Sequence, residues 1–239
     1  MPTKKGRSLT SVTMDVFESH AKGRRAALLP VGAVEAHGHH LSIETDDIVA
    51  TSLVKEVSSR TDILALPAIS YGYLKGLKDF QGSVSLSQVT FRMVLSDIAV
   101  SLAEKGISKL GVVNCHIPNS PLIDEVSHLV KDRIKLLNLS FPGVDYVVKN
   151  ICTSKQWHPG IFHAEEIETS LMLNLAPELV EMTKAKPSYP SKPMDFGIRY
   201  MPWSDFAPDG VIGDPTQATK EKGEKIFEYF VGRIIALMT

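Results

Sequence analysis

The apolar residues of this chain fall alternately into short continuous runs and into longer stretches with a spacing of three to four residues. The short runs predict buried strands, and the spaced stretches predict amphipathic helices. Strands are expected at 26–31, 63–66, 110–113 and 144–148. Helices are expected at 14–23, 47–57, 89–103, 120–134 and 165–175, and from Thr216 or Thr219 to 237. This alternation predicts an α/β fold, a three-layer α/β/α arrangement with a mostly parallel central sheet.

Two long segments carry no sustained period. Residues 71–87 are punctuated by glycines and are expected to form a loop that serves as a pocket wall, since loops of this length in a folded domain are usually functional. Residues 184–215 are rich in proline and aromatic residues, which favours an irregular lid or oligomerisation arm. With 239 residues, of which 44% are hydrophobic, residues 1–239 are expected to form a single domain.

Charge and composition narrow the class of partner. The formal net charge is -1, and no basic run stands out beyond Lys4, Lys5 and Arg7, so the sequence indicates neither a nucleic-acid surface nor a membrane surface. A small molecule is the expected partner. We see no secretory pattern and no apolar stretch of about 20 residues, and the two cysteines make no disulfide framework. These features favour a cytoplasmic protein.

Side chains that bind metals are concentrated directly after the first expected strand. Glu35 and His37 alternate there, so in an extended chain both would point the same way, and Asp46 returns after a short loop. An aspartate that arrives between two such ligands is well placed to bridge two cations. Mixed nitrogen and oxygen donors without a thiolate suit Zn, Mn or Fe. The alternative is a polar surface loop with a chance cluster of histidines.

Two further stretches add to this cluster. His116 follows the strand expected at 110–113, and His163 and Glu168 lie at the start of a later helix. In an α/β fold with a parallel sheet, ligands bind outside the carboxyl ends of the strands, where these residues are expected. No nucleophile elbow, Walker loop or dinucleotide fingerprint is present, which removes the chemistry of serine hydrolases, NTPases and Rossmann dehydrogenases.

Together these stretches resemble the creatininase family of metal-dependent amidohydrolases. The family's first motif, PVG-x-x-E-x-HG-x-H-L-x-x-x-TD, is matched over 30–46. Its second motif, close to NGHGGN, is met by NCHIPN at 114–119, and its third, HAG-x-x-ETS, by HAEEIETS at 163–170. GVIGDP at 210–215 also looks like the family's GVxGDP segment. The resemblance covers nearly the whole chain.

The resemblance implies two divalent metal ions per chain and a set of residue roles. Glu35, Asp46 and His116 would hold one ion, while His37, the shared Asp46 and Glu168 would hold the second. His163 would be the catalytic histidine that delivers a proton to the leaving nitrogen, with Glu168 or Glu165 able to orient it. His40 would support the loop as a hydrogen-bond donor behind the ligands. The family tendency also implies a homo-oligomer, a hexamer built as a trimer of dimers.

The motifs also depart from the family pattern. Cys115, Ile117 and Pro118 replace small residues of the second motif, and Pro118 stands where creatininase itself has a metal-binding glutamate. Glu165 replaces the usual glycine of the third motif and could supply the missing carboxylate instead of Glu168. Trp157 is the candidate for a tryptophan beside the substrate.

The sequence thus predicts a dinuclear amidohydrolase that cleaves a small cyclic amide or a related carbon–nitrogen bond. Within the family, a formamide deformylase of pterin or flavin precursor synthesis and a peptide-processing hydrolase are the alternatives. From another class, the same residues could form a structural metal site in a non-catalytic binding protein.

Overall fold

Four parallel strands form the sheet around which the chain is wound. The computed structural model describes residues 12–23 and 26–239, and in this part of the chain the strand order is β2-β1-β3-β4. The strands are β1 (Ala26–Val31), β2 (Leu64–Ala65), β3 (Lys109–Asn114) and β4 (Lys135–Asn138). Each neighbouring pair is parallel. The expected parallel sheet is therefore confirmed.

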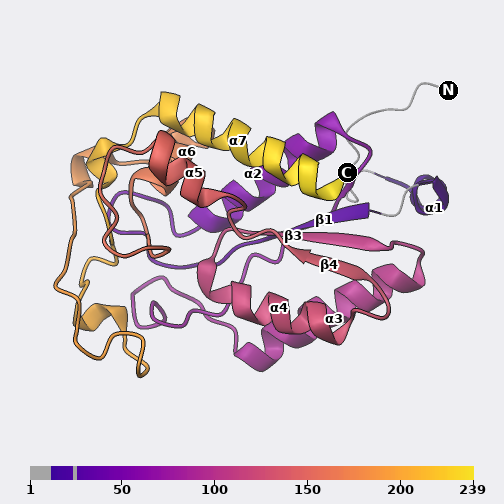
Figure 1. Ribbon diagram of the computed structural model, residues 1–239, viewed down its shortest axis with the longest axis horizontal. Helices are drawn as coiled ribbons and strands as arrows, with labels where there is room; N and C mark the ends of the chain where they lie inside the picture. The colour runs from indigo at the N-terminus through magenta and orange to yellow at the C-terminus, as the bar shows by residue number, and fades with distance from the viewer. Residues whose placement is uncertain (1–11, 24–25) are drawn as a thin grey trace.

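Helices cover both faces of this sheet, which gives the expected three layers (Figure 1). On one face lie α2 (Thr45–Arg60), α5 (Val144–Asn150), α6 (Glu166–Leu175) and α7 (Lys220–Met238), and on the other α3 (Gln88–Glu104) and α4 (Ser120–Leu129). Alternate residues of β1 serve the two faces: Leu28 packs with the first group of helices and Leu29 with the second. The short α1 (Met14–Gly23) contributes Phe17 to the second group.

One expected strand is a helix. Residues 144–148 were expected to be extended because valines are enriched in strands, but Val144–Asn150 is α5. Val144, Val147 and Val148 have helical spacing, and all three pack on the core. The fourth strand is instead β4, which falls directly after the end of the helix expected at 120–134. That helix stops at Leu129.

The closing helix begins where a capping residue permits. The Thr219 side chain accepts a hydrogen bond from the backbone N–H of Lys222, so α7 starts after Thr219 and not at Thr216. Ile226, Phe230 and Ile234 are buried as expected. Leu237 was also expected to face inward but is 41% exposed, because Met238 takes the inward position at the last turn.

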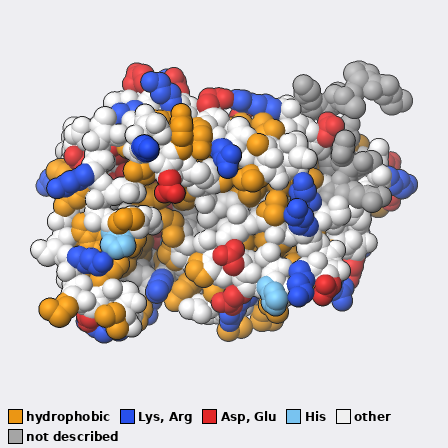
Figure 2. All heavy atoms as spheres, in the orientation of Figure 1, with side chains coloured by type: hydrophobic (Ala, Val, Ile, Leu, Met, Phe, Trp, Pro, Cys, Tyr) orange, Lys and Arg blue, Asp and Glu red, His pale blue; other side chains and the backbone are white. Residues whose placement is uncertain are grey.

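The remaining segments are mostly irregular. Short 3₁₀ helices occur at Ile117–Asn119, Pro177–Leu179, Met182–Lys184, Trp203–Asp205 and Pro215–Gln217. Residues 184–215, called the arm below, form no α-helix and none of the sheet's strands, as expected, and lie at one end of the molecule (Figure 1). On the face shown in Figure 2, acidic and basic side chains are interspersed with apolar ones. No helix in the described ranges is long and apolar enough to cross a bilayer.

Candidate metal centre

The candidate site lies where two central strands end side by side. Val31 at the end of β1 pairs with Asn114 at the end of β3, so the loops that follow them leave the sheet at the same edge. Gly32 lets the start of α2 approach this edge closely, since a Cβ there would lie 2.6 Å from the backbone N of Asp47. The fold thereby places Asp46, in the first turn of α2, beside the two loops.

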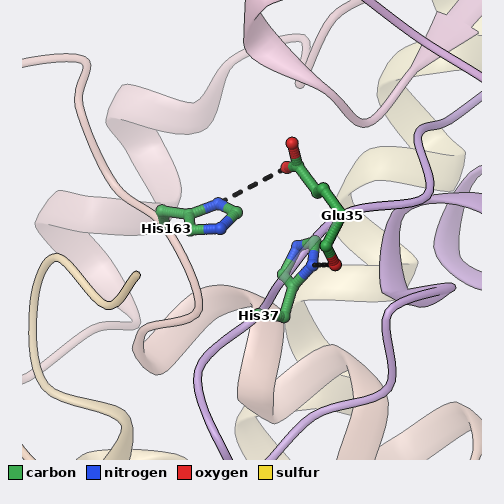
Figure 3. Close-up of side chains that lie close together, drawn as sticks. All are labelled: Glu35, His37 and His163. Carbon is green, nitrogen blue, oxygen red and sulfur yellow. Dashed lines mark hydrogen bonds and ion pairs between the residues drawn. The ribbon is translucent and has the colours of Figure 1, made fainter. Parts of the chain in front are cut away.

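Six ionisable side chains from separate segments meet at this edge and are buried. They are Glu35, His37, Asp46, His116, His163 and Glu168, none more than 5% exposed. Their nitrogen and oxygen atoms form three overlapping groups compact enough for a metal ion: Glu35 with Asp46 and His116, His37 with Asp46 and Glu168, and Glu35 with His37 and His163. Figure 3 shows the last of these, with Glu35 directed toward the His163 ring. The structure thus brings together the six side chains that the sequence proposed as metal ligands or catalytic groups, while Glu165 and Trp157 stay outside the cluster.

Asp46 lies between two histidines. Its Oδ1 is 3.1 Å from His37 Nε2, and its Oδ2 is 3.3 Å from His116 Nδ1. Glu35 Oε1 approaches the same His116 nitrogen at 3.0 Å, while Glu168 Oε2 is 3.8 Å from His37 Nε2. Asp46 therefore joins the two halves of the cluster. The half with His116 also contains Glu35, and the half with His37 also contains Glu168.

Backbone carbonyl groups fix how the three histidines present their nitrogens. Because a carbonyl oxygen can only accept, the ring nitrogen facing it must carry the proton. The pairs are His37 Nδ1 with Glu35 O (3.1 Å), His116 Nε2 with Tyr73 O (3.0 Å) and His163 Nε2 with Ala36 O (2.8 Å). In each ring the other nitrogen faces the carboxylates and is the one that could bind a metal ion once it is deprotonated. Metal-ligating histidines are commonly held in this way.

The electrostatics of the cluster show an excess of buried acid. Burial raises the pKa of Glu35, and it raises the pKa of Glu168 to about 8. Burial alone disfavours a charged His37, but Asp46 outweighs it and raises the pKa of His37 to about 10. The carboxylates Glu35 and Asp46 likewise outweigh burial at His116 and raise its pKa to about 10. The carboxylates therefore draw positive charge into the site.

His163 differs from the other two histidines. Burial, followed by the repulsion of His37, lowers the pKa of His163 to about 3, so its ring is neutral. Glu35 Oε1 and Glu168 Oε2 lie 3.7 and 4.0 Å from its Nδ1, farther than a hydrogen bond. The group that orients this ring by a hydrogen bond is the Ala36 carbonyl, where the sequence had suggested Glu168 or Glu165.

The donor set fits divalent metal ions. Glu35 Oε2, His37 Nε2 and Asp46 Oδ2 are buried atoms that make no hydrogen bond within the described chain. His37 Nε2 and Asp46 Oδ2 have only the ion pairs within the cluster, and Glu35 Oε2 has no partner among the described residues; an unpaired buried atom is costly, and a cation would supply a partner. Burial also raises the pKa of Cys115, whose thiol stays protonated beside the cluster. Imidazole and carboxylate ligands without thiolate are typical of Zn, Mn and Fe sites.

Comparison with known proteins decides the family. A family model described as creatininase, creatinine amidohydrolase, matches residues 10–238. The chain belongs to the creatininase family. Creatinine amidohydrolase of Pseudomonas putida is 30% identical over 227 residues, covering 88% of this chain and 87% of that protein. A mycofactocin precursor peptide peptidase of Mycobacterium ulcerans is 29% identical, with coverage of 85% and 80%.

Solved creatininase structures share the fold. A crystal structure of creatinine amidohydrolase superimposes with a TM-score of 0.88 at 28% identity, covering 98% of this chain and 96% of that one. A mutant creatininase of the Zn-Zn type gives a TM-score of 0.87, and a manganese form gives 0.83. This creatininase-family chain is thus a hydrolase that acts on carbon–nitrogen bonds and has candidate residues for divalent metal binding.

The departures from the family motifs have distinct places in the structure. Pro118 lines a cavity in front of His116 and brings no ligand atom to the cluster. Glu165 belongs to none of the ligand groups among the described residues; its side chain accepts a hydrogen bond from Ile167 N and caps α6. Glu168 does belong to one of these groups.

Sequence reasoning missed one aromatic side chain at the site. Trp203, from the arm, lines the cavity and packs edge-on against His163 with the ring centroids 5.5 Å apart. Trp157 instead packs against Phe196 and Phe206, and it does not line this cavity. The arm has no periodicity that would relate it to the site. The sequence shows only a glycine at position 76; in the structure a Cβ there would lie 2.3 Å from the Trp203 ring.

Proposed function

We propose that this creatininase-family protein is a dinuclear metal-dependent amidohydrolase. The observation that carries the proposal is the position of Asp46, which turns one oxygen to His37 Nε2 and the other to His116 Nδ1. Glu35, Asp46 and His116 would hold one ion, and His37, Asp46 and Glu168 the other. When bound, two such ions would lower the pKa of a water molecule and polarise the amide carbonyl.

His163 would carry the proton. Its Nε2 is committed to Ala36 O, and its Nδ1 keeps a lone pair directed into the cluster beside Glu35. A histidine in this state can take a proton from the attacking water and deliver it to the leaving nitrogen. The edge of Trp203 covers one side of the ring and limits the access of other water to it.

The bond cleaved is proposed to be an amide, either in a small cyclic compound of the creatinine type or in a related formyl amide. The similarity to a precursor peptide peptidase supports peptide processing as a second candidate. The non-catalytic alternative is wrong, because the chain belongs to a family of hydrolases that act on carbon–nitrogen bonds. We also infer a homo-oligomer, since the arm exposes Met194 (101%) and Ile198 (82%).

The test combines metal analysis with turnover. We expect purified protein to contain about two divalent ions per chain, and we expect a chelator to abolish amide hydrolysis that Zn or Mn then restores. A panel of lactams, formamides and short peptides supplies the substrates. Activity that survives complete removal of metal, or a fully loaded protein that hydrolyses none of the panel, would overturn the proposal.

A further inference from the structure

A large cavity opens directly in front of the candidate metal centre. It has a volume of about 630 Å³, and Glu35, His116, His163 and Glu168 form its floor. Cavities of this size take ligands as large as a drug molecule. A small cyclic amide would fill only a fraction of the space and would leave the rest to water. The dimensions of the cavity therefore point to a larger substrate.

Much of the rest of the cavity lining is apolar. Three segments supply the residues that we call the apolar wall: Ile117, Pro118, Ile161, Phe196, Met201 and Trp203. The charged side chains at the cavity are engaged or exposed to solvent. Asp124 accepts a hydrogen bond from Asn138, Arg199 pairs with Asp195, and Lys75 is exposed. The part of the lining that still needs a partner is hydrocarbon.

The apolar wall is fixed in place next to the histidine that would protonate the leaving nitrogen. Trp203 N donates a hydrogen bond to Gly76 O (2.9 Å), and the Trp203 ring lies so close to Gly76 that no side chain fits there. The same ring packs edge-on against His163. A group attached to the leaving nitrogen is therefore the part of a substrate that lies nearest the apolar wall.

We propose that the substrate is an amide whose nitrogen carries a bulky apolar group of aromatic size, bound against the apolar wall. The proposal rests on the proposed amidohydrolase function and narrows its substrate class. Burial of an aromatic side chain is worth a factor of about 10–100 in kcat/KM when the contact persists in the transition state. The small ring of creatinine cannot gain this factor.

Matched substrates test the proposal on the metal-loaded enzyme. The two substrates of a pair share the scissile bond and differ only in the group on the nitrogen, which is methyl in one and 2-phenylethyl in the other. One pair consists of formamides, one of acetamides and one of lactams. We expect kcat/KM for the phenylethyl member to exceed that of the methyl member by about 10–100-fold. A separate probe, phenylacetyl methylamide, carries the aromatic group on the acyl side. Its gain in kcat/KM over the methyl acetamide is expected to be smaller.

Two substitutions in the same arm separate wall contact from general disturbance. Met201→Trp narrows the cavity and should reduce the phenylethyl-to-methyl ratio about tenfold. Ser191→Trp is the control: Ser191 is exposed and absent from the cavity, so both rates should stay unchanged. If Met201→Trp does not fold with normal metal content, Phe196→Ala replaces it, and the loss of wall area should again lower the ratio.

The outcomes are distinct. Equal or better hydrolysis of the methyl members, a greater gain from the acyl-side group, or a ratio unaffected by both wall substitutions would overturn the substrate class while leaving the amidohydrolase function intact. Failure to hydrolyse any member of the panel, with both metals bound, would instead overturn the proposed function.

Discussion

Replacement of Asn119 by alanine should weaken both the fold and the metal centre. Asn119 is fully buried and joins three segments at the carboxyl edge of the sheet. Its Oδ1 accepts from Tyr73 N (2.9 Å), and its Nδ2 donates to Gly32 O (3.2 Å) and Asn114 Oδ1 (3.1 Å). These partners belong to the loop at 71–87, the end of β1 and the end of β3.

The structure sets the size of the stability loss. Asn114 Oδ1 keeps a second donor, His116 N at 3.3 Å, so the groups that lose their partner are Tyr73 N and Gly32 O. A buried polar group left unpaired costs about 1–3 kcal/mol, which gives about 2–6 kcal/mol for the two. This is a large part of the total stability of about 5–15 kcal/mol that is usual for a domain.

The metal centre should respond through Tyr73. Its carbonyl oxygen accepts the hydrogen bond from His116 Nε2 (3.0 Å), which keeps Nδ1 directed at Glu35 and Asp46. Without Asn119 the segment that carries this carbonyl loses its tie to the sheet. Loss of such an orienting partner typically lowers metal affinity by about 10–100-fold, which competition with a chelator measures.

Asn138→Ala is the matched control. Asn138 is also an amide at the end of a strand, β4, and it donates to Ser120 O (3.2 Å), Ser120 Oγ (2.7 Å) and Asp124 (2.8 Å). Its Oδ1 accepts from Ser140, whose hydroxyl accepts from Asn114, so two side chains separate Asn138 from His116; urea denaturation should show lost stability with a smaller loss of metal affinity than in Asn119→Ala. The reasoning is wrong if Asn119→Ala binds metal as tightly as the wild type, or if the two variants lose affinity equally.

Three further predictions follow from single residues. Asp46→Ala should lose both ions, because its two oxygens face the two halves of the cluster; elemental analysis that finds one ion fully retained would contradict this. His163→Ala should lower turnover by about 10²–10⁴-fold with normal metal content, whereas His116→Ala should lower both; a parallel loss of metal in the His163 variant would make His163 a ligand. Ala164→Gly should change the free energy of unfolding by less than about 1 kcal/mol, since relief of the φ of 50° is offset by loss of a buried methyl group and by the entropy of glycine in the unfolded chain; a larger change in urea denaturation would contradict this.

The sequence predicted the parts of the site that depend on side-chain chemistry. Four of the candidate ligands come after strands that can be recognised by their apolar runs: Glu35, His37, Asp46 and His116. The end of each run marks the edge of the sheet where ligands bind. The family motifs added His163 and Glu168, whose segment approaches the others only through the packing of α6 on α2 and α7. No local pattern contains that packing.

Two features could not be predicted in this way. The groups that orient His116 and His163 are the backbone carbonyls of Tyr73 and Ala36, and any residue type offers a carbonyl. The helix at Val144–Asn150 was expected as a strand because valine favours strands, while its helical spacing is too short to stand out. In both cases the deciding interactions are tertiary.

The fold supplies opposite partial charges to the two kinds of ligand. Asp46 and Glu168 lie in the first turns of α2 and α6, where the positive end of the helix dipole favours a carboxylate, and Glu168 also accepts a hydrogen bond from Ala164 N (2.6 Å). The ring N–H groups of His37 and His116 instead meet carbonyl oxygens, which leaves the other nitrogen of each ring turned inward, where a metal ion could replace its proton. Carboxylate oxygens and histidine nitrogens are thereby both held toward one cluster by the backbone. Such a site is organised for cations by the same strand and helix ends that build the core.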